Sequence, residues 1–210
     1  GLITMVGYQR RFAVTFMKAK ELMNDGIIGD ILRFEANAFS SDFFATSSTQ
    51  AKKARGGVLR DLGSHVIDLT LWLFKDISII RDTVSVSLDN AAFSVIGPNN
   101  SQGYFRISWA EEGYRMPEIR IKVAGTKGLI EVNDDYIVLK DSSGELRTWY
   151  RADLNDNVPF LLGMPEYYRE DEYFINCILQ KNRPSPDFFE ASKVDHIISE
   201  VERYAFSSRG

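Results

Sequence analysis

Residues 118–140, EIRIKVAGTKGLIEVNDDYIVLK, contain three short runs that favour β-strands, separated by residues that favour turns. The runs cover residues 118–124, 129–133 and 136–140, and the turns are Gly-Thr-Lys-Gly at 125–128 and Asn-Asp-Asp at 133–135. Turn residues of these types, placed between β-favouring runs, indicate direct connections between neighbouring strands. Because such short connections reverse the chain, the stretch predicts adjacent antiparallel strands.

Similar runs extend the sheet on both sides of this stretch, and helical patterns surround them. Further strands are predicted at residues 31–39, 83–88, 92–96, 103–110 and 146–149. Helices are predicted where apolar residues recur at helical spacing, at residues 12–23, 58–74, 166–180 and 189–207. The sum is an α+β domain, a largely antiparallel open sheet of six to eight strands with helices on one face.

Composition places the chain among globular domains and argues against two kinds of partner. Of 210 residues, 44% are hydrophobic and 26% are charged, and the net charge is −4. Lys and Arg are dispersed, so neither nucleic acid nor an anionic membrane surface is an expected partner. No apolar run reaches the roughly 20 residues of a spanning helix, and the N-terminus has no export signal. With the single Cys177 excluding an internal disulfide, we expect a cytoplasmic protein.

Two surfaces of the predicted fold stand out. Residues 40–55 are rich in Ser, Thr, Ala and Lys and make a long connection, which is typical of a lid or a binding loop. The sheet has a second face that the helices leave uncovered. If aromatic residues of the strands lie on it, a partner subunit must exclude water from them, and we expect self-association through this face. The aromatic candidates are Phe93, Tyr104, Phe105 and Trp109.

The stretch richest in potential chemistry is GGVLRDLGSHVIDL, residues 56–69. On a helix, Asp61 and His65 are four positions apart and share one face. A carboxylate beside an imidazole fixes its tautomer and favours its protonated form, and such a pair suits proton transfer from an alcohol. Two other interpretations stay open: a capping or structural pair, and a metal site built on Asp61, His65 and Asp68, for which no further His or Cys ligand is evident.

Several dispersed motifs resemble one enzyme family, the oxidoreductases that include glucose-fructose oxidoreductase, inositol 2-dehydrogenase and MocA-type proteins. The segment GGVLRDLGSHVID at 56–68 is similar to that family's signature. Four more motifs agree in order and spacing, VGYQRRF at 6–12, GIIGDI at 26–31, GTKG at 125–128 and YAFSS at 204–208. The resemblance therefore covers essentially the whole chain.

The resemblance implies a two-domain enzyme whose N-terminal Rossmann domain binds NAD or NADP. This chain is similar only to the second part, with its glyceraldehyde-3-phosphate dehydrogenase-like fold. It lacks a Gly-x-Gly-x-x-Gly turn and the Glu-Lys-Pro motif whose lysine completes the site in the family. The expected division is a remnant of the exit strand of the missing domain at 1–10 and a substrate-binding and oligomerisation domain at 11–210. The chain is then an excised fragment or the product of a split or truncated gene, inactive alone.

The resemblance implies that His65 is the general base and that Asp61 supports the substrate and the base. We expect Arg55, Lys53 and Asp68 to bind substrate, Arg11 to face the cofactor, and no metal ion. The predicted activity of the full-length protein is NAD(P)-dependent oxidation of a CH–OH group of a sugar, inositol or related polyol, or the reverse reduction. The predicted assembly is a homodimer or homotetramer. Two alternatives are a non-catalytic binding or assembly module of the same fold and a metal-dependent hydrolase.

Overall fold

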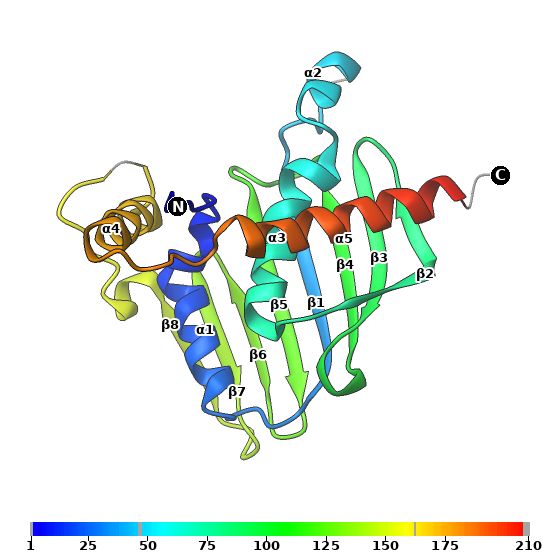
Figure 1. Cartoon of the computed structure of the whole chain (residues 1–210). Coiled ribbons are helices and arrows are strands. Elements are labelled where there is room, and N and C mark those ends of the chain that lie inside the picture. The colour runs from blue at the N-terminus through cyan, green and yellow to red at the C-terminus, as the bar shows by residue number, and fades with distance from the viewer. Residues whose placement is uncertain (1, 46–47, 162, 208–210) are drawn as a thin grey trace.

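A computed structural model describes residues 2–45, 48–161 and 163–207 and contains one eight-stranded sheet (Figure 1). The strand order is β2-β3-β4-β1-β5-β6-β7-β8. The bounds are β1 Ile31–Phe39, β2 Ser78–Val86, β3 Asn90–Ile96, β4 Gln102–Ser108, β5 Glu118–Gly125, β6 Leu129–Asn133, β7 Tyr136–Lys140 and β8 Leu146–Tyr150. The predicted α+β fold with a largely antiparallel open sheet is confirmed.

The first strand in the sequence lies in the middle of the sheet and makes its one parallel pairing. Ala36 of β1 is opposite Phe105 of β4 in a parallel register and opposite Ile121 of β5 in an antiparallel one. A parallel pair requires a long crossover, and residues 40–101, with two helices and two strands, supply it. All other neighbouring strands are antiparallel.

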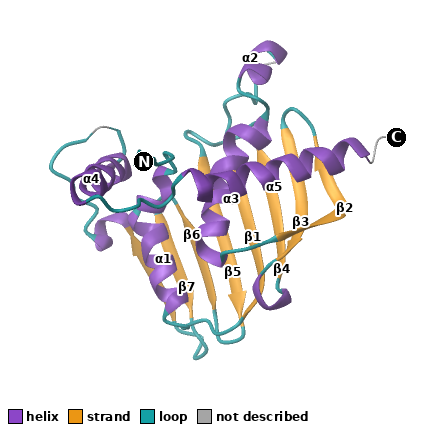
Figure 2. Cartoon of the chain, in the orientation of Figure 1, coloured by secondary structure: helices purple, strands orange, loops and turns teal. Residues whose placement is uncertain are grey.

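Helices cover one face of the sheet, as predicted (Figure 2). The bounds are α1 Val14–Asn24, α2 Thr49–Ala54, α3 Val58–Phe74, α4 Pro165–Gln180 and α5 Phe188–Ser207, with short 3-10 turns η1 Gln9–Phe12, η2 Pro98–Asn100 and η3 Arg151–Leu154. In Figure 1, α1, α3 and α5 lie in front of the sheet and α4 lies beyond its β8 side. Helix α3 is the most buried, with 11 buried residues among its 17, whereas the longer helix α5 has five among 20.

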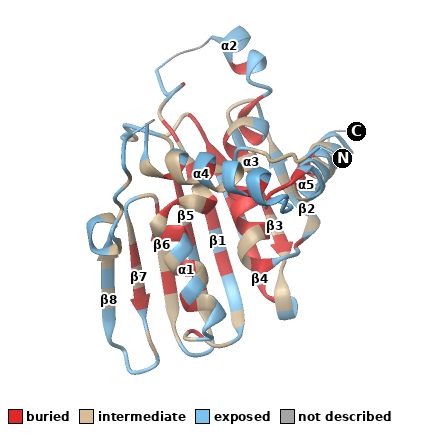
Figure 3. Ribbon diagram, turned by 60° about the vertical axis from the view of Figure 1, so that its left-hand side comes forward, coloured by how far each residue is buried: buried red, intermediate tan, exposed pale blue. Residues whose placement is uncertain are grey.

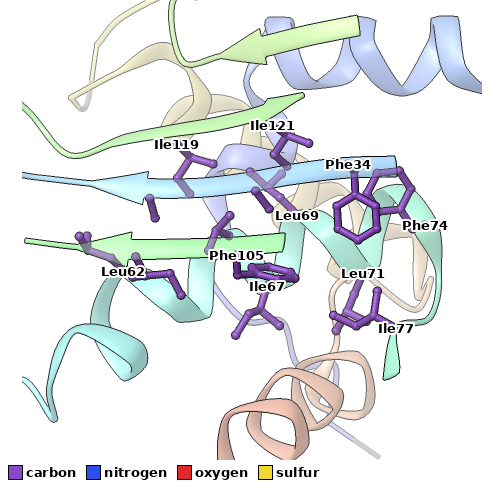
Figure 4. Close-up of a cluster of buried hydrophobic side chains, with 14 of the residues drawn as sticks. Phe34, Leu62, Ile67, Leu69, Leu71, Phe74, Ile77, Phe105, Ile119 and Ile121 are labelled. Atoms are coloured by element: carbon purple, nitrogen blue, oxygen red, sulfur yellow. The ribbon is translucent and has the colours of Figure 1, made fainter. Parts of the chain in front are cut away.

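The core lies between α3 and the central strands (Figure 4). Phe34, Phe105 and Ile121 point from three adjacent strands toward α3, where they meet Ile67 and Leu69. Alternation along each strand places the intervening residues on the other face. In β5, for example, Ile119, Ile121 and Val123 are buried, whereas Lys122 is exposed.

The uncovered face of the sheet is mainly polar and carries a few aromatic side chains, such as Tyr136 of β7 and Tyr150 of β8, whose rings are in contact. Phe93, Phe105 and Trp109 are fully buried, and Tyr104, 41% exposed, is the one of the four predicted aromatic residues on the open face. Its neighbours there include Glu35 and Arg106. In Figure 3, the inner strands carry buried segments, whereas β8 at the edge of the sheet carries none. Buried and exposed residues alternate along β4, so burying Phe105 against the helices turns Tyr104 outward.

Two local expectations differ from the structure, and the first described residues of the chain form no strand within it. Residues 40–55 do not form a plain loop, because α2 begins at Thr49 after Ser48 accepts a hydrogen bond from the backbone N–H of Ala51. Residues 2–8 belong to no strand of the described chain, although the N–H of Val6 donates to the carbonyl of Pro186. Strand β2 begins at Ser78 instead of residue 83. Ser208, at the end of the predicted closing motif, lies outside the described residues.

Within the described ranges, no helix is both long enough and apolar enough to cross a membrane.

Candidate active site

A cavity of about 580 Å³ opens at the end of the sheet where β1 and β4 finish and β5 begins. Its size lies within the range of small-molecule sites. Its walls come from η1, α3, the β4–β5 loop, the β6–β7 turn and the start of α4. The lining residues that carry charge or a titratable ring are Arg10, Asp42, Arg55, Asp61, His65, Tyr114, Arg115, Glu118, Asp134, Asp135, Glu166 and Tyr167.

Helix α3 carries both predicted catalytic residues into this cavity. The chain enters the helix through Gly56 and Gly57, whose φ values of 81° and 84° are strained for any residue with a side chain. The N–H of Val58 then donates to the carbonyl of Leu88, which fixes the start of the helix beside the sheet. Asp61 and His65 follow on successive turns and both line the cavity.

His65 is a neutral imidazole in this site. Burial lowers its pKa to about 4, and the positive charge of Arg10 acts in the same direction. The edge of the Tyr8 ring meets the imidazole at a centroid distance of 5.9 Å. The buried Nδ1 has no hydrogen-bond partner among the described residues. The expectation that a neighbouring carboxylate favours the protonated form is therefore wrong, because desolvation dominates and no Asp61–His65 hydrogen bond forms in the described chain.

Asp61 pairs with an arginine rather than with the histidine. The guanidinium of Arg55 lies 3.3 Å from the carboxylate of Asp61 and 2.8 Å from that of Asp42. One cation therefore holds two carboxylates at the mouth of the cavity, and each of the three side chains is about a third to a half exposed. Arg55, predicted to bind substrate, lines the same cavity as Asp61 and His65.

Asp68 and Arg11 lie away from the cavity, in contact with each other. Asp68, 1% exposed, accepts two hydrogen bonds from Arg11 at 2.6 and 2.8 Å. Burial raises the pKa of Asp68 to about 6 against the opposing effect of Arg11, so the carboxylate is ionised at neutral pH. Arg11 also bonds Ser185 and Glu190. The predictions of a substrate contact for Asp68 and a cofactor contact for Arg11 do not fit this structure, because each satisfies the other in the interior.

The position of Lys53 in α2 also differs from expectation. Lys53 is exposed and does not line the cavity of the described structure. Its neighbour Lys52 is buried and pairs with Asp89 at 2.7 Å. The helical turn of α2 separates the two side chains, so only one of them reaches the body of the domain.

A second wall of the cavity was not predicted from the sequence. Arg10 bonds Asp134 at 2.8 Å and the carbonyl of Pro117 at 2.9 Å, and Asp134 also accepts the N–H of Ile119. Arg151 joins this wall to α4 through Glu166 at 2.6 Å. In the sequence, Asp134 is recognisable only as a turn residue. Its partner Arg10 is 124 positions away, so no local pattern joins the two.

No group of three His, Cys, Asp or Glu side chains in the described ranges is arranged to hold a metal ion. The metal-site interpretation of Asp61, His65 and Asp68 has no geometric support there, since Asp68 bonds Arg11 instead.

Comparison with known proteins agrees with the predicted family. The model for the GFO/IDH/MocA C-terminal domain matches residues 16–131, more than half of the chain. Inositol 2-dehydrogenase of Rhizobium meliloti (strain 1021) is 28% identical over 185 residues, which are 83% of this chain and 54% of that protein.

Solved structures share the fold at low sequence identity. Levoglucosan dehydrogenase in complex with NADH has a TM-score of 0.83 at 20% identity, covering 98% of this chain and 64% of that one. An oxidoreductase domain protein from Kribbella flavida has a TM-score of 0.83 at 19% identity, covering 99% and 66%. The chain thus spans about half the length of its curated relative and about two thirds of these structures. It belongs to the family of GFO/IDH/MocA C-terminal domains.

Proposed function

We propose that residues 11–210 form the substrate-binding domain of an NAD(P)-dependent oxidoreductase that acts on a CH–OH group of a sugar, inositol or related polyol. The observation that carries the proposal is a neutral histidine, His65, in the wall of a cavity rich in hydrogen-bonding side chains. Membership in the family and the name of its relative, inositol 2-dehydrogenase, support the same class of substrate.

The cavity residues suit alcohol oxidation in two ways. An imidazole that is neutral at pH 7 accepts the hydroxyl proton as the C–H bond breaks and the C–O bond becomes a carbonyl. The carboxylates of Asp61 and Asp42 accept hydrogen bonds from neighbouring hydroxyl groups, and Arg55 holds them in place. When bound, the nicotinamide supplies the acceptor for the hydride. In the reverse direction, the imidazolium returns the proton to the carbonyl oxygen.

The residues present fit a substrate pocket and not a dinucleotide cradle. The chain has no Gly-x-Gly-x-x-Gly turn. Arg11, the residue predicted to face the cofactor, forms a buried ion pair with Asp68. In this proposal the rest of the full-length protein holds NAD or NADP, residues 1–10 connect to that part, and this chain alone does not turn over.

Self-association through the open sheet face is part of the proposal. Ion pairs such as Lys122–Glu131 and the exposed ring of Tyr104 make that face mixed in charge and partly aromatic. A homodimer or homotetramer formed there would bury polar groups in pairs, as many interfaces do. Light scattering on the wild type and on Tyr104→Arg tests it, and an unchanged oligomer would place the interface elsewhere.

The central test uses the full-length gene product with NAD and NADP against a panel of sugars and polyols. We expect His65→Ala to abolish turnover while cofactor binding persists, and His196→Ala, a control at an exposed position of α5, to keep wild-type turnover. Unchanged turnover in His65→Ala, or none with any substrate despite cofactor binding, would instead favour a non-catalytic binding module. The engagement of Asp61 by Arg55 rather than by His65 is the observation that fits that alternative.

A further inference from the structure

The loop between β4 and β5 lines the cavity and is fixed at both ends by hydrogen bonds. At its start, Ser41 donates to the carbonyl of Glu111 at 2.6 Å and accepts the N–H of Tyr114 at 2.8 Å. At its end, the carbonyl of Pro117 accepts a hydrogen bond from Arg10. Ser41 adjoins Asp42 on the α3 side of the cavity, and Arg10 belongs to the opposite wall. The residues between these anchors, Arg115 and Met116, line the cavity.

The cavity has three arginines, and two of them are already neutralised. Arg10 pairs with Asp134, and Arg55 pairs with Asp42 and Asp61. Arg115 is the third. It is exposed, lines the cavity, and makes no hydrogen bond or ion pair with any residue that the structure describes.

A guanidinium that lines a cavity without a partner can bind an anion. It offers five N–H donors in a planar fork and no acceptor, and a carboxylate satisfies two of those donors at once. A neutral hydroxyl group offers the same fork a single oxygen and no charge. The anchors on either side of Arg115 reduce the backbone freedom lost when the loop binds a ligand.

We infer that the substrate of this site carries a carboxylate, as in a sugar acid or polyhydroxy acid, and that Arg115 binds this group while the carbinol lies at His65. The inference rests on the proposed oxidoreductase function and names its substrate class. Six carboxylates line the rest of the cavity, at Asp42, Asp61, Glu118, Asp134, Asp135 and Glu166. This acidic surrounding favours a single negative charge placed at Arg115 over the double charge of a phosphate ester.

The test compares matched substrates in the full-length protein. The pairs are gluconate with sorbitol and glucuronate with glucose, and glucose 6-phosphate is the phosphate arm. We expect kcat/KM to favour the acid of each pair, and Arg115→Gln to reduce the acid-to-neutral ratio about 10- to 100-fold, the usual weight of a charge-assisted pair. Arg81→Gln, at an exposed position of β2, should leave the ratio unchanged.

Calorimetric titration of the acids, without turnover, separates the two proposals. If no substrate is oxidised but gluconate or glucuronate binds the wild type and not Arg115→Gln, the proposed reaction fails and the anion site stands. The inference is overturned if kcat/KM favours the neutral member of each pair, or if Arg115→Gln leaves the acid-to-neutral ratio unchanged. It is also overturned if kcat/KM is higher for glucose 6-phosphate than for the acids, or if Arg115→Gln lowers only the affinity for the cofactor.

Discussion

Replacement of Asp68 by alanine should damage stability rather than substrate recognition. The carboxylate is 1% exposed and accepts both hydrogen bonds of the Arg11 guanidinium. The Arg11 side chain is 5% exposed. In Asp68→Ala, its guanidinium keeps only Ser185 and the partly exposed Glu190 as partners. Loss of one member of a buried ion pair costs about 3–5 kcal/mol. At roughly 2–4 °C per kcal/mol for a chain of this size, Tm should fall by about 10 °C.

The assay is urea and thermal unfolding followed by circular dichroism, with Asp61→Ala as the matched control. Asp61 lies two turns earlier on α3 and is 32% exposed, so its loss should cost less than about 1 kcal/mol. The double replacement Arg11→Met with Asp68→Leu should recover most of the loss, because no buried charge then remains unpaired. A cost below about 1 kcal/mol for Asp68→Ala, or a double variant no better than the single one, would refute the reasoning.

Three further predictions follow from burial. Burial raises the pKa of Glu170 to about 7, so the folded chain keeps a proton that the unfolded chain releases near 4.5. The free energy of unfolding should therefore fall as pH rises between these two values. In urea unfolding, Glu170→Gln should stabilise the protein by up to about 3 kcal/mol at pH 8 and not at pH 4, and an equal effect at both pH values would contradict this reasoning. The NMR titration of His65 should show a neutral ring down to about pH 5, and the free energy of unfolding should fall as pH decreases from 6.5 toward 4. A titration midpoint near 6.5, like that of a free imidazole, would show instead that the ring is solvated. Gly103→Ala should cost about 1–3 kcal/mol, because a Cβ there would lie 2.2 Å from the ring of Phe34; Phe34→Leu in the same chain should reduce that cost, and additive losses would argue against the clash.

Local patterns predicted most elements of the fold. Helix α3 and strands β6 and β7 have the predicted bounds, because each is set by a period of apolar residues and by turn residues within a few positions of its ends. The polar composition of residues 40–55 hid helix α2, since a helix of six residues is too short for a period to emerge. Pairing order was also hidden: the position of β1 beside β4 joins segments about 70 residues apart.

The sequence also predicted some features of the candidate site and not others. The sequence by itself determined that Asp61 and His65 share a helix face behind two glycines, and its motifs indicated the family. Only the tertiary structure decided that Arg55 pairs with Asp61, that burial keeps His65 neutral, and that Asp68 binds Arg11 in the interior. Charge pairing and desolvation depend on neighbours that folding brings from distant positions, so a one-dimensional pattern cannot distinguish a carboxylate that meets substrate from one that holds the core together.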